Sequence, residues 1–137
     1  MTGADPGAPP GIEALPELRL TLVRDNRAPG IARAATRAWS ESAGLDTGRH
    51  DTLVLLVSEL VTNAALHSEG PADAPILLTV DLDGGVVRGA VTDAGSGFTP
   101  GRRRVSDPGG FGLYLVARES LRWGVDRIGA TRVWFDL

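Results

Sequence analysis

The chain contains neither cysteine nor lysine, and all 14 basic residues among its 137 residues are arginine. Without cysteine it has no disulfide, no zinc–thiolate site and no thiol nucleophile. Without lysine it has no Schiff-base lysine and no phosphate-binding loop of the G-x-x-x-x-G-K-[ST] type, because that loop needs its lysine. These two absences exclude several common kinds of catalytic site.

Long apolar runs and an excess of positive charge are also missing. No segment reaches the roughly 18 uninterrupted apolar residues of a membrane-spanning helix. The net charge of -3 argues against direct nucleic-acid binding. Residues 1–16 hold four prolines and three glycines, and they lack the basic start and apolar core of a signal peptide. We therefore expect a cytoplasmic protein with a disordered leader at 1–16 and one folded domain at 17–137.

The first half of the folded part predicts a strand and two helices. Apolar residues alternate with polar ones at 18–22, as in a half-buried strand. An alanine-rich run opens near Pro29 and closes at Gly44, which suits the first turn and the end of a helix. Asp46 or Thr47 is placed to cap the next helix, at about 47–68. That helix is apolar on nearly every face, so we expect it to be buried.

The second half predicts two hairpins separated by a loop and a helix. Strands at 76–82 and 86–92 flank an Asp83-Gly84-Gly85 turn, and the segments GVDRI and TRVWFDL flank Gly129-Ala130. Six glycines and two prolines make 93–112 a long loop, followed by an amphipathic helix in FGLYLVARESLRW. This order predicts an α+β fold, a two-layer sandwich whose mostly antiparallel mixed sheet is covered by helices on one face.

A polar stripe interrupts the buried helix. Glu59, Thr62 and Asn63 are spaced i, i+3, i+4, which places them on one face. They either hydrogen-bond to loop backbone and hold the fold together, or they form a hard-cation site. In the second case Asn63 offers its carbonyl oxygen to Mg²⁺ and Glu59 takes a proton from a nucleophile.

Two glycine-rich segments follow. Asp93-Ala94-Gly95-Ser96-Gly97 comes straight after a strand, as either an ordinary turn or a place where a ligand lies against the backbone. Gly109-Gly110-Phe111-Gly112-Leu113 opens a helix, as either a linker or an anion site made by exposed N–H groups. Neither segment decides between its two interpretations on its own.

The order and spacing of these segments resemble the Bergerat-type ATP-binding fold of gyrase, the ninety-kilodalton heat-shock chaperone, sensor histidine kinases and MutL-type proteins. SELVTNAALHS, VTDAGSGF, GGFGLYLVARESLRWGV and the closing VWFDL resemble more closely the short, single-domain histidine-kinase-like ATPases of actinobacteria. These are relatives of the anti-sigma-factor serine kinases. The resemblance covers about residues 17–137.

The resemblance implies a role for the polar residues. Asn63 is expected to ligate the Mg²⁺ that bridges the ATP phosphates, and Glu59 to act as general base on a substrate hydroxyl or a water. Asp93 is expected to accept a hydrogen bond from the adenine amino group and so to select adenine.

The resemblance also implies a glycine-lined nucleotide site with a lid at 98–109. The expected ATP-contacting positions in the two glycine-rich segments are Gly95, Gly97, Gly110, Phe111, Gly112 and Leu113. Arg102, Arg103 and Arg104 lie within the lid, and Arg102 and Arg103 are the expected phosphate contacts. Since the chain has no lysine, any side-chain cation on the phosphates must be arginine, whose fork suits bidentate phosphate contact. The alternative is a solvated basic run.

Three functions remain open at this point. The resemblance favours an anti-sigma factor with serine/threonine kinase activity towards an anti-sigma-factor antagonist, so the implied partners are ATP or ADP, a sigma factor and an antagonist-domain protein. The alternatives are an ATP-binding partner-recognition module with little or no phosphotransfer, and a simple ATPase. Related kinases pair, so the resemblance also suggests a homodimer.

Overall fold

The described part of the chain folds into one five-stranded sheet and three helices. The computed structural model describes residues 17–66, 73–93, 110–127 and 129–137. The strands are β1 (Leu18–Leu22), β2 (Ile76–Asp83), β3 (Val86–Asp93), β4 (Arg122–Arg127) and β5 (Thr131–Asp136), and the helices are α1 (Ala28–Ala43), α2 (Thr47–Leu66) and α3 (Gly110–Glu119). The expected leader at 1–16 lies outside the described residues.

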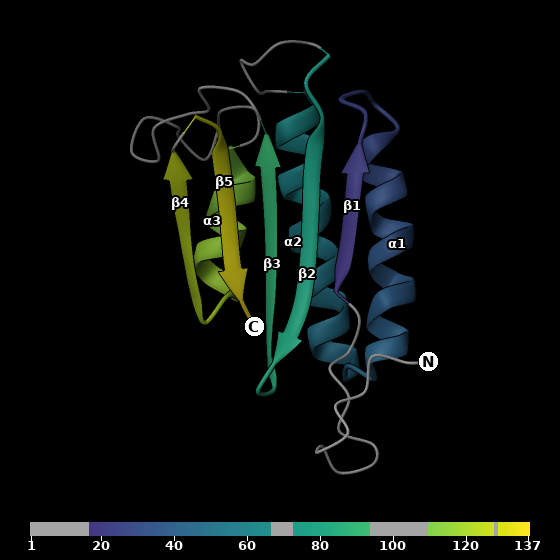
Figure 1. Cartoon of the computed structure of the whole chain (residues 1–137). Helices are drawn as coiled ribbons and strands as arrows, with labels where there is room; N and C mark the ends of the chain where they lie inside the picture. The colour runs from purple at the N-terminus through teal and green to yellow at the C-terminus, as the bar shows by residue number, and fades with distance from the viewer. Residues whose placement is uncertain (1–16, 67–72, 94–109, 128) are drawn as a thin grey trace, which may run out of the picture.

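The sheet has the order β1-β2-β3-β5-β4, and all three helices lie behind it in one layer (Figure 1). Helix α3 returns the chain to the end of the sheet where β3 began, so β4 runs parallel to β3 and lies two positions away from it in the sheet. The final hairpin then places β5 in the gap between them. The predicted α+β sandwich is confirmed. It differs in one respect, since every pairing among the described strands is antiparallel.

The predicted helix boundaries in the first half are confirmed by their caps. Pro29 lies in the first turn of α1, and Gly44 ends that helix with a left-handed φ of 70° that side chains disfavour. Asp46 caps α2, because its Oδ2 accepts a hydrogen bond from the Arg49 amide at 3.1 Å. The described part of α2 ends at Leu66, and residues 67 and 68 lie outside it.

Helix α2 is the centre of the core, as its sequence predicts. It packs against α1, α3, β2 and β3. Its fully buried apolar side chains include Leu53, Leu56, Val57 and Val61. Burying each such side chain stabilises the fold by about 1.5–3 kcal/mol relative to leaving it exposed, so the packing of α2 fixes the position of its few polar residues.

The predicted third helix, in FGLYLVARESLRW, is too long at its C-terminal end. Helix α3 begins at Gly110, one residue before that segment and within the last residues of the predicted 93–112 loop, and it ends at Glu119 rather than continuing through Trp123. After the helix, the Leu121 amide donates to the Asp136 carbonyl oxygen at 2.7 Å, and Arg122 begins β4. Pairing with β5 outweighs the local helical pattern, because the backbone N–H and C=O groups along β4 find hydrogen-bond partners in β5. None of the helices in the described part of the chain has the length and apolar content needed to span a membrane.

Candidate active site at one end of the sandwich

Four chain segments meet at one end of the sandwich. The end of α2, the end of β3, the start of α3 and the start of β5 all lie at the upper end in Figure 1. This follows from the topology, because α2 and β3 run toward that end while α3 and β5 run away from it. The fold therefore brings the polar stripe of α2, Asp93 and the glycine-rich helix start to the same end.

Glu59 and Asn63 lie one turn apart on α2. Asn63 is buried at 7% exposure, and Glu59 is half-buried. Thr62, the third member of the predicted stripe, donates its hydroxyl to the Ser58 carbonyl oxygen at 2.7 Å. This local bond accounts for Thr62 within its own helix. The other two polar groups of the stripe are the Glu59 carboxylate and the Asn63 amide.

Arg33 reaches the same region from α1. Its Nη1 donates to the Ser58 Oγ at 2.9 Å, and Ser58 immediately precedes Glu59 in the chain. The bond ties the middle of α2 to the neighbouring helix. The sequence does not predict this pair, because residues 25 positions apart on two helices carry no local signal of their contact.

Asp93 closes β3 and lies directly opposite Thr131, the first residue of β5. Both follow the alternation of the core residues Val91 and Val133, so their side chains lie on the helix-covered face of the sheet. Thr131 is 1% exposed. Thr131 is not among the site residues predicted from the sequence. The alternation within TRVWFDL would have placed it on the same face as Val133, but only the strand register reveals that its neighbour is Asp93.

The glycine-rich start of α3 contributes backbone to this end of the molecule. Gly110, Phe111 and Gly112 form its first turn, and Leu113 is buried in the core at 8% exposure. The first N–H groups of a helix have no partner within the helix and favour an anion. Four of the expected nucleotide-contacting positions lie outside the described residues, namely Gly95, Gly97, Arg102 and Arg103, as does the expected lid at 98–109.

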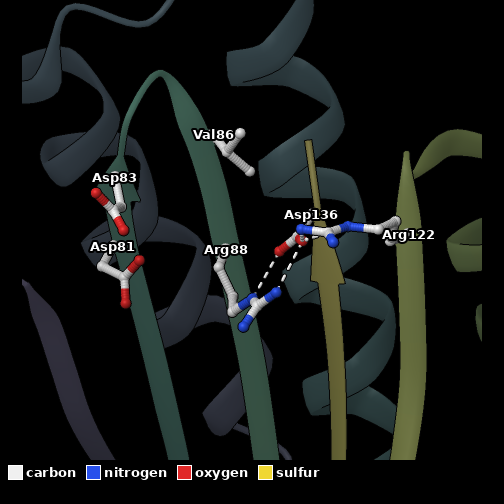
Figure 2. Close-up of a pocket in the computed structure, with 6 residues that line it drawn as sticks. All are labelled: Asp81, Asp83, Val86, Arg88, Arg122 and Asp136. Atoms are coloured by element: carbon white, nitrogen blue, oxygen red, sulfur yellow. Dashed lines mark hydrogen bonds and ion pairs between the residues drawn. The ribbon is translucent and has the colours of Figure 1, made fainter.

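Two hollows that described residues line lie elsewhere. One of about 320 Å³ is on the open face of the sheet and is lined by Asp81, Asp83, Val86, Arg88, Arg122 and Asp136 (Figure 2). Another, of about 560 Å³, lies beside the start of α2 and includes Arg49, Gly85 and Leu121. Neither is lined by Glu59, Asn63 or Asp93. The candidate site is therefore defined by Glu59, Asn63 and Asp93, since the expected lid and the segment from residue 94 to 97 lie outside the described part.

The hollow in Figure 2 owes its charge to an arginine–carboxylate network. Arg88 donates to both oxygens of Asp136, at 2.6 and 2.8 Å, and Arg122 donates to Oδ2 at 2.7 Å. The hydrogen bonds from Arg88 and then Arg122 hold the pKa of Asp136 below its usual value, against the opposing effect of burial. Within the described ranges, no cluster of three or more acidic or histidine side chains is suited to hold a metal by itself.

Comparison with known proteins agrees with this arrangement. Residues 23–127 match the family model described as a histidine kinase-like ATPase domain. The chain is also similar to the crystal structure of the RsbU and RsbW domains of Rv1364c from Mycobacterium tuberculosis, with 25% sequence identity and a TM-score of 0.71. That match covers 88% of this chain and 32% of the crystallised chain. No curated protein sequence matches.

The family match covers most of the chain and includes α2, β3 and α3. An ATPase domain binds a nucleotide, which agrees with the polar residues and helix start gathered at one end of the sandwich. The fold, the match and the site together place this chain in the family of histidine kinase-like ATPase domains.

Proposed function

We propose that the chain is an ATP-binding anti-sigma factor that phosphorylates a serine or threonine of an anti-sigma-factor antagonist. The observation that carries the proposal is the pair on α2: a buried amide, Asn63, one turn from a half-buried carboxylate, Glu59. Because Glu59 is half-buried, a substrate can still reach its carboxylate, and the helix holds the residue in place. The family match and the similarity to a chain containing an RsbW domain support the same class of protein.

In the proposed reaction the γ-phosphoryl group moves from ATP to the substrate hydroxyl. The hydroxyl oxygen forms a bond to the γ-phosphorus, the bond to the β–γ bridging oxygen breaks, and ADP leaves. Glu59 takes the hydroxyl proton, the role of a general base. Catalysis of this kind depends chiefly on positioning and on charge stabilisation.

Magnesium fits the donor chemistry at this end of the sandwich. Asn63 would hold the ion through its amide oxygen, with the remaining ligands supplied by phosphate and water oxygens. The absence of a carboxylate cluster among the described residues agrees with a metal that arrives with the nucleotide. When bound, Mg²⁺ neutralises phosphate charge.

Asp93 and Thr131 are the proposed adenine-recognition pair. A carboxylate accepts a hydrogen bond from an exocyclic amine, and a buried hydroxyl both donates and accepts. Their opposition across β3 and β5 places both groups on the same face of the sheet as α2. Gly95, Gly97 and the start of α3 complete the nucleotide site in this proposal, with Arg102 and Arg103 in the lid.

The test is to incubate the purified chain with γ-labelled ATP, Mg²⁺ and antagonist-domain proteins from the same genome. Label on a serine or threonine of the antagonist supports the kinase. ATP binding without transfer of label supports the partner-recognition module instead, and release of labelled phosphate without protein labelling supports a simple ATPase. Failure to bind ATP by calorimetry contradicts the nucleotide site itself.

A further inference from the structure

The hollow in Figure 2 lies where β5 ends before its neighbouring strands do. β5 ends at Asp136, opposite Arg88, whereas β2 and β3 continue for a further row, in which Asp83 pairs with Val86. The space left at this corner of the sheet has a volume of about 320 Å³. Pockets for small molecules begin at about 300 Å³, so the hollow has the size of a site for a small ligand.

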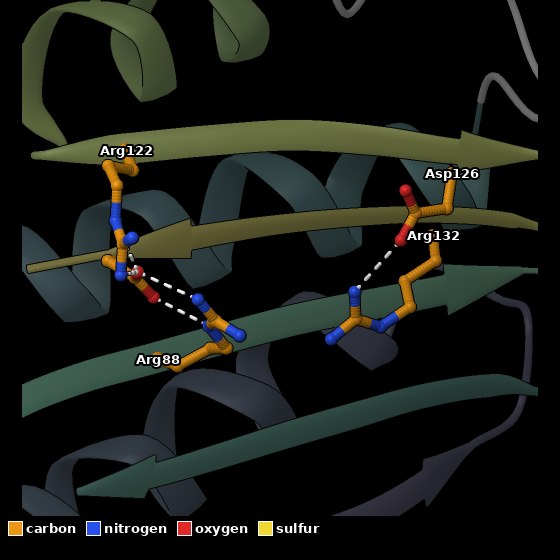
Figure 3. A network of polar contacts seen from close by, with 5 residues as sticks. Arg88, Arg122, Asp126 and Arg132 are labelled. Carbon is orange, nitrogen blue, oxygen red and sulfur yellow. Dashed lines mark hydrogen bonds and ion pairs between the residues drawn. The ribbon is translucent and has the colours of Figure 1, made fainter. Parts of the chain in front are cut away.

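The floor and one wall of the hollow are basic. Arg88 and Arg122 each donate from Nε and Nη2 to Asp136, whose side chain is only 2% exposed between them (Figure 3). Two guanidinium groups around one carboxylate leave one positive charge in excess. A guanidinium has five N–H donors, so Nη1 of each arginine is left for another acceptor. Arg122, at 68% side-chain exposure, presents its donors to solvent.

The opposite wall is acidic. Asp81 and Asp83 are two residues apart on β2, so both side chains project from the open face of the sheet, across the hollow from Arg122 (Figure 2). None of the ion pairs among the described residues includes either carboxylate. Burial, followed by repulsion from Glu17, raises the pKa of Asp81. Both carboxylates would therefore gain from a cation in the hollow.

These charges define the ligand that would match them. Once Asp136 is neutralised, the lining has two unpaired carboxylates and one excess positive charge. The complementary ligand carries two cations and one carboxylate. Asp81 and Asp83 are about 7 Å apart along the strand. The two amino groups of an extended lysine are joined by six bonds of about 1.5 Å, which also separates them by roughly 7 Å.

We propose that this hollow binds a free basic amino acid, lysine or arginine. Its α-ammonium group binds Asp81 and its carboxylate binds Arg122, because these residues lie on opposite walls in one row across the sheet. Its side chain runs along the strand over Val86, so that the terminal cation meets Asp83. The ligand thus uses both walls and the apolar corner of the hollow.

Other small ions match the hollow less well. A neutral amino acid leaves one carboxylate without a partner, and an acidic amino acid brings a negative charge towards Asp83. A diamine has no acceptor for Arg122. Unpaired or like charges within a site disfavour the wrong ligand. The hollow lies at the β2–β3 hairpin end of the sheet, opposite the end where α2 and β3 finish, so it is separate from the proposed nucleotide site (Figure 1).

Isothermal titration calorimetry of the full chain at low salt tests the site. L-Lysine or L-arginine should bind saturably at millimolar concentration or below. D81N and D83N should each raise the dissociation constant about tenfold or more, because each weakens a hydrogen bond between charged groups. The matched control D51N changes an exposed carboxylate on α2 and should leave the constant unaltered. Circular dichroism melts verify folding, and D83N, at an exposed position, carries the test if D81N does not fold.

Ligand analogues test the remaining contacts. Agmatine lacks the carboxylate of arginine, and L-norleucine lacks the terminal cation of lysine, so each should bind about tenfold more weakly or worse than its parent. Nα-acetyl-L-lysine amide, which imitates a lysine within a peptide, should bind as weakly and so distinguishes a free amino acid from a basic protein segment. Absence of saturable binding by both amino acids, equal binding of any of these analogues, or an affinity unchanged by both D81N and D83N overturns the proposal.

Discussion

Asp93 and Thr131 lie directly opposite each other on β3 and β5, with both side chains on the face of the sheet that the helices cover. Their neighbours along the strands, Val91 and Val133, belong to the hydrophobic core. A carboxylate and a hydroxyl at the rim of a core are suited to recognise the polar edge of a flat, largely apolar ligand. We therefore expect a substitution at either residue to change the affinity for ATP.

Asp93→Asn should weaken ATP binding about 10- to 100-fold, because an amide presents a donor where the carboxylate accepted and a hydrogen bond to a charged group is worth about 1.5–3 kcal/mol. Isothermal titration calorimetry gives the affinity. Asp83→Asn makes the same change at the opposite, exposed end of the β2–β3 hairpin and should leave the affinity unaltered. Equal affinity of Asp93→Asn and the parent chain would count against the nucleotide assignment.

Thr131→Val should lower ATP affinity about 5- to 10-fold, since it removes one hydroxyl while keeping the shape of the side chain, and a single hydrogen bond contributes about 1 kcal/mol. A fluorescent ATP analogue in competition with ATP measures the loss. If valine changes the melting temperature but not the affinity, Thr131 serves the fold and not the ligand.

Glu59→Ala should retain ATP binding and reduce transfer to the antagonist about 10²- to 10⁴-fold, the usual contribution of a general base. The labelling assay and calorimetry on the same preparation separate the two effects. Asp51→Ala is the control, since Asp51 is an exposed carboxylate two turns earlier on α2. Undiminished transfer by the Glu59 variant removes this residue from the proposed role.

Gly89→Ala should destabilise the fold by about 1–3 kcal/mol through overpacking. A Cβ at Gly89 would lie 2.4 Å from the Cζ atom of Phe135, whose ring is fully buried against it. A Cβ at Gly30, in the first turns of α1, would make only an ordinary van der Waals contact with Arg33 at 3.7 Å, so Gly30→Ala should instead stabilise the fold by up to about 1 kcal/mol. Urea unfolding of both variants should show these opposite signs, and similar changes in both would contradict the packing argument.

Asp136→Asn should cost about 1.5–3 kcal/mol at neutral pH, because hydrogen bonds from two arginines to a charged acceptor are weakened. The native pKa of Asp136 is lowered from 3.8, so its carboxylate contributes full stability above that value and loses it as the pH falls through the native pKa. The stability difference between the parent chain and the variant should therefore shrink below pH 3.8. A difference that is constant with pH would show that the charge on Asp136 is not what stabilises the network.

Local features of the sequence predicted most of the architecture. Pro29 and Gly44 marked the ends of a helix, Gly84 and Gly85 marked a hairpin, and the apolar run of α2 marked a buried helix. Each of these depends on interactions within a few residues, where backbone preference and hydrophobic period act directly. The sequence could also predict that Glu59 and Asn63 share one face of α2, since a helix places residues four apart on the same face.

The end of α3 shows where local reasoning failed. SLRW continues the helical pattern, yet Arg122 belongs to β4, where it pairs with β5 and binds Asp136, 14 positions further along the chain. The hydrophobic periodicity of a segment carries no information about the stabilisation that it gains by pairing with a strand distant in the sequence. The same limit concealed the Arg33–Ser58 bond.

The sequence by itself determined the family, the helix caps, the turns and the polar pair on α2, because each is set by neighbouring residues or by a recognisable order of motifs. Only the tertiary structure decided that Thr131 lies beside Asp93 and that Asp136 is enclosed by Arg88 and Arg122. These relationships depend on which strands are adjacent and in what register, and that choice is made by the packing of the whole core.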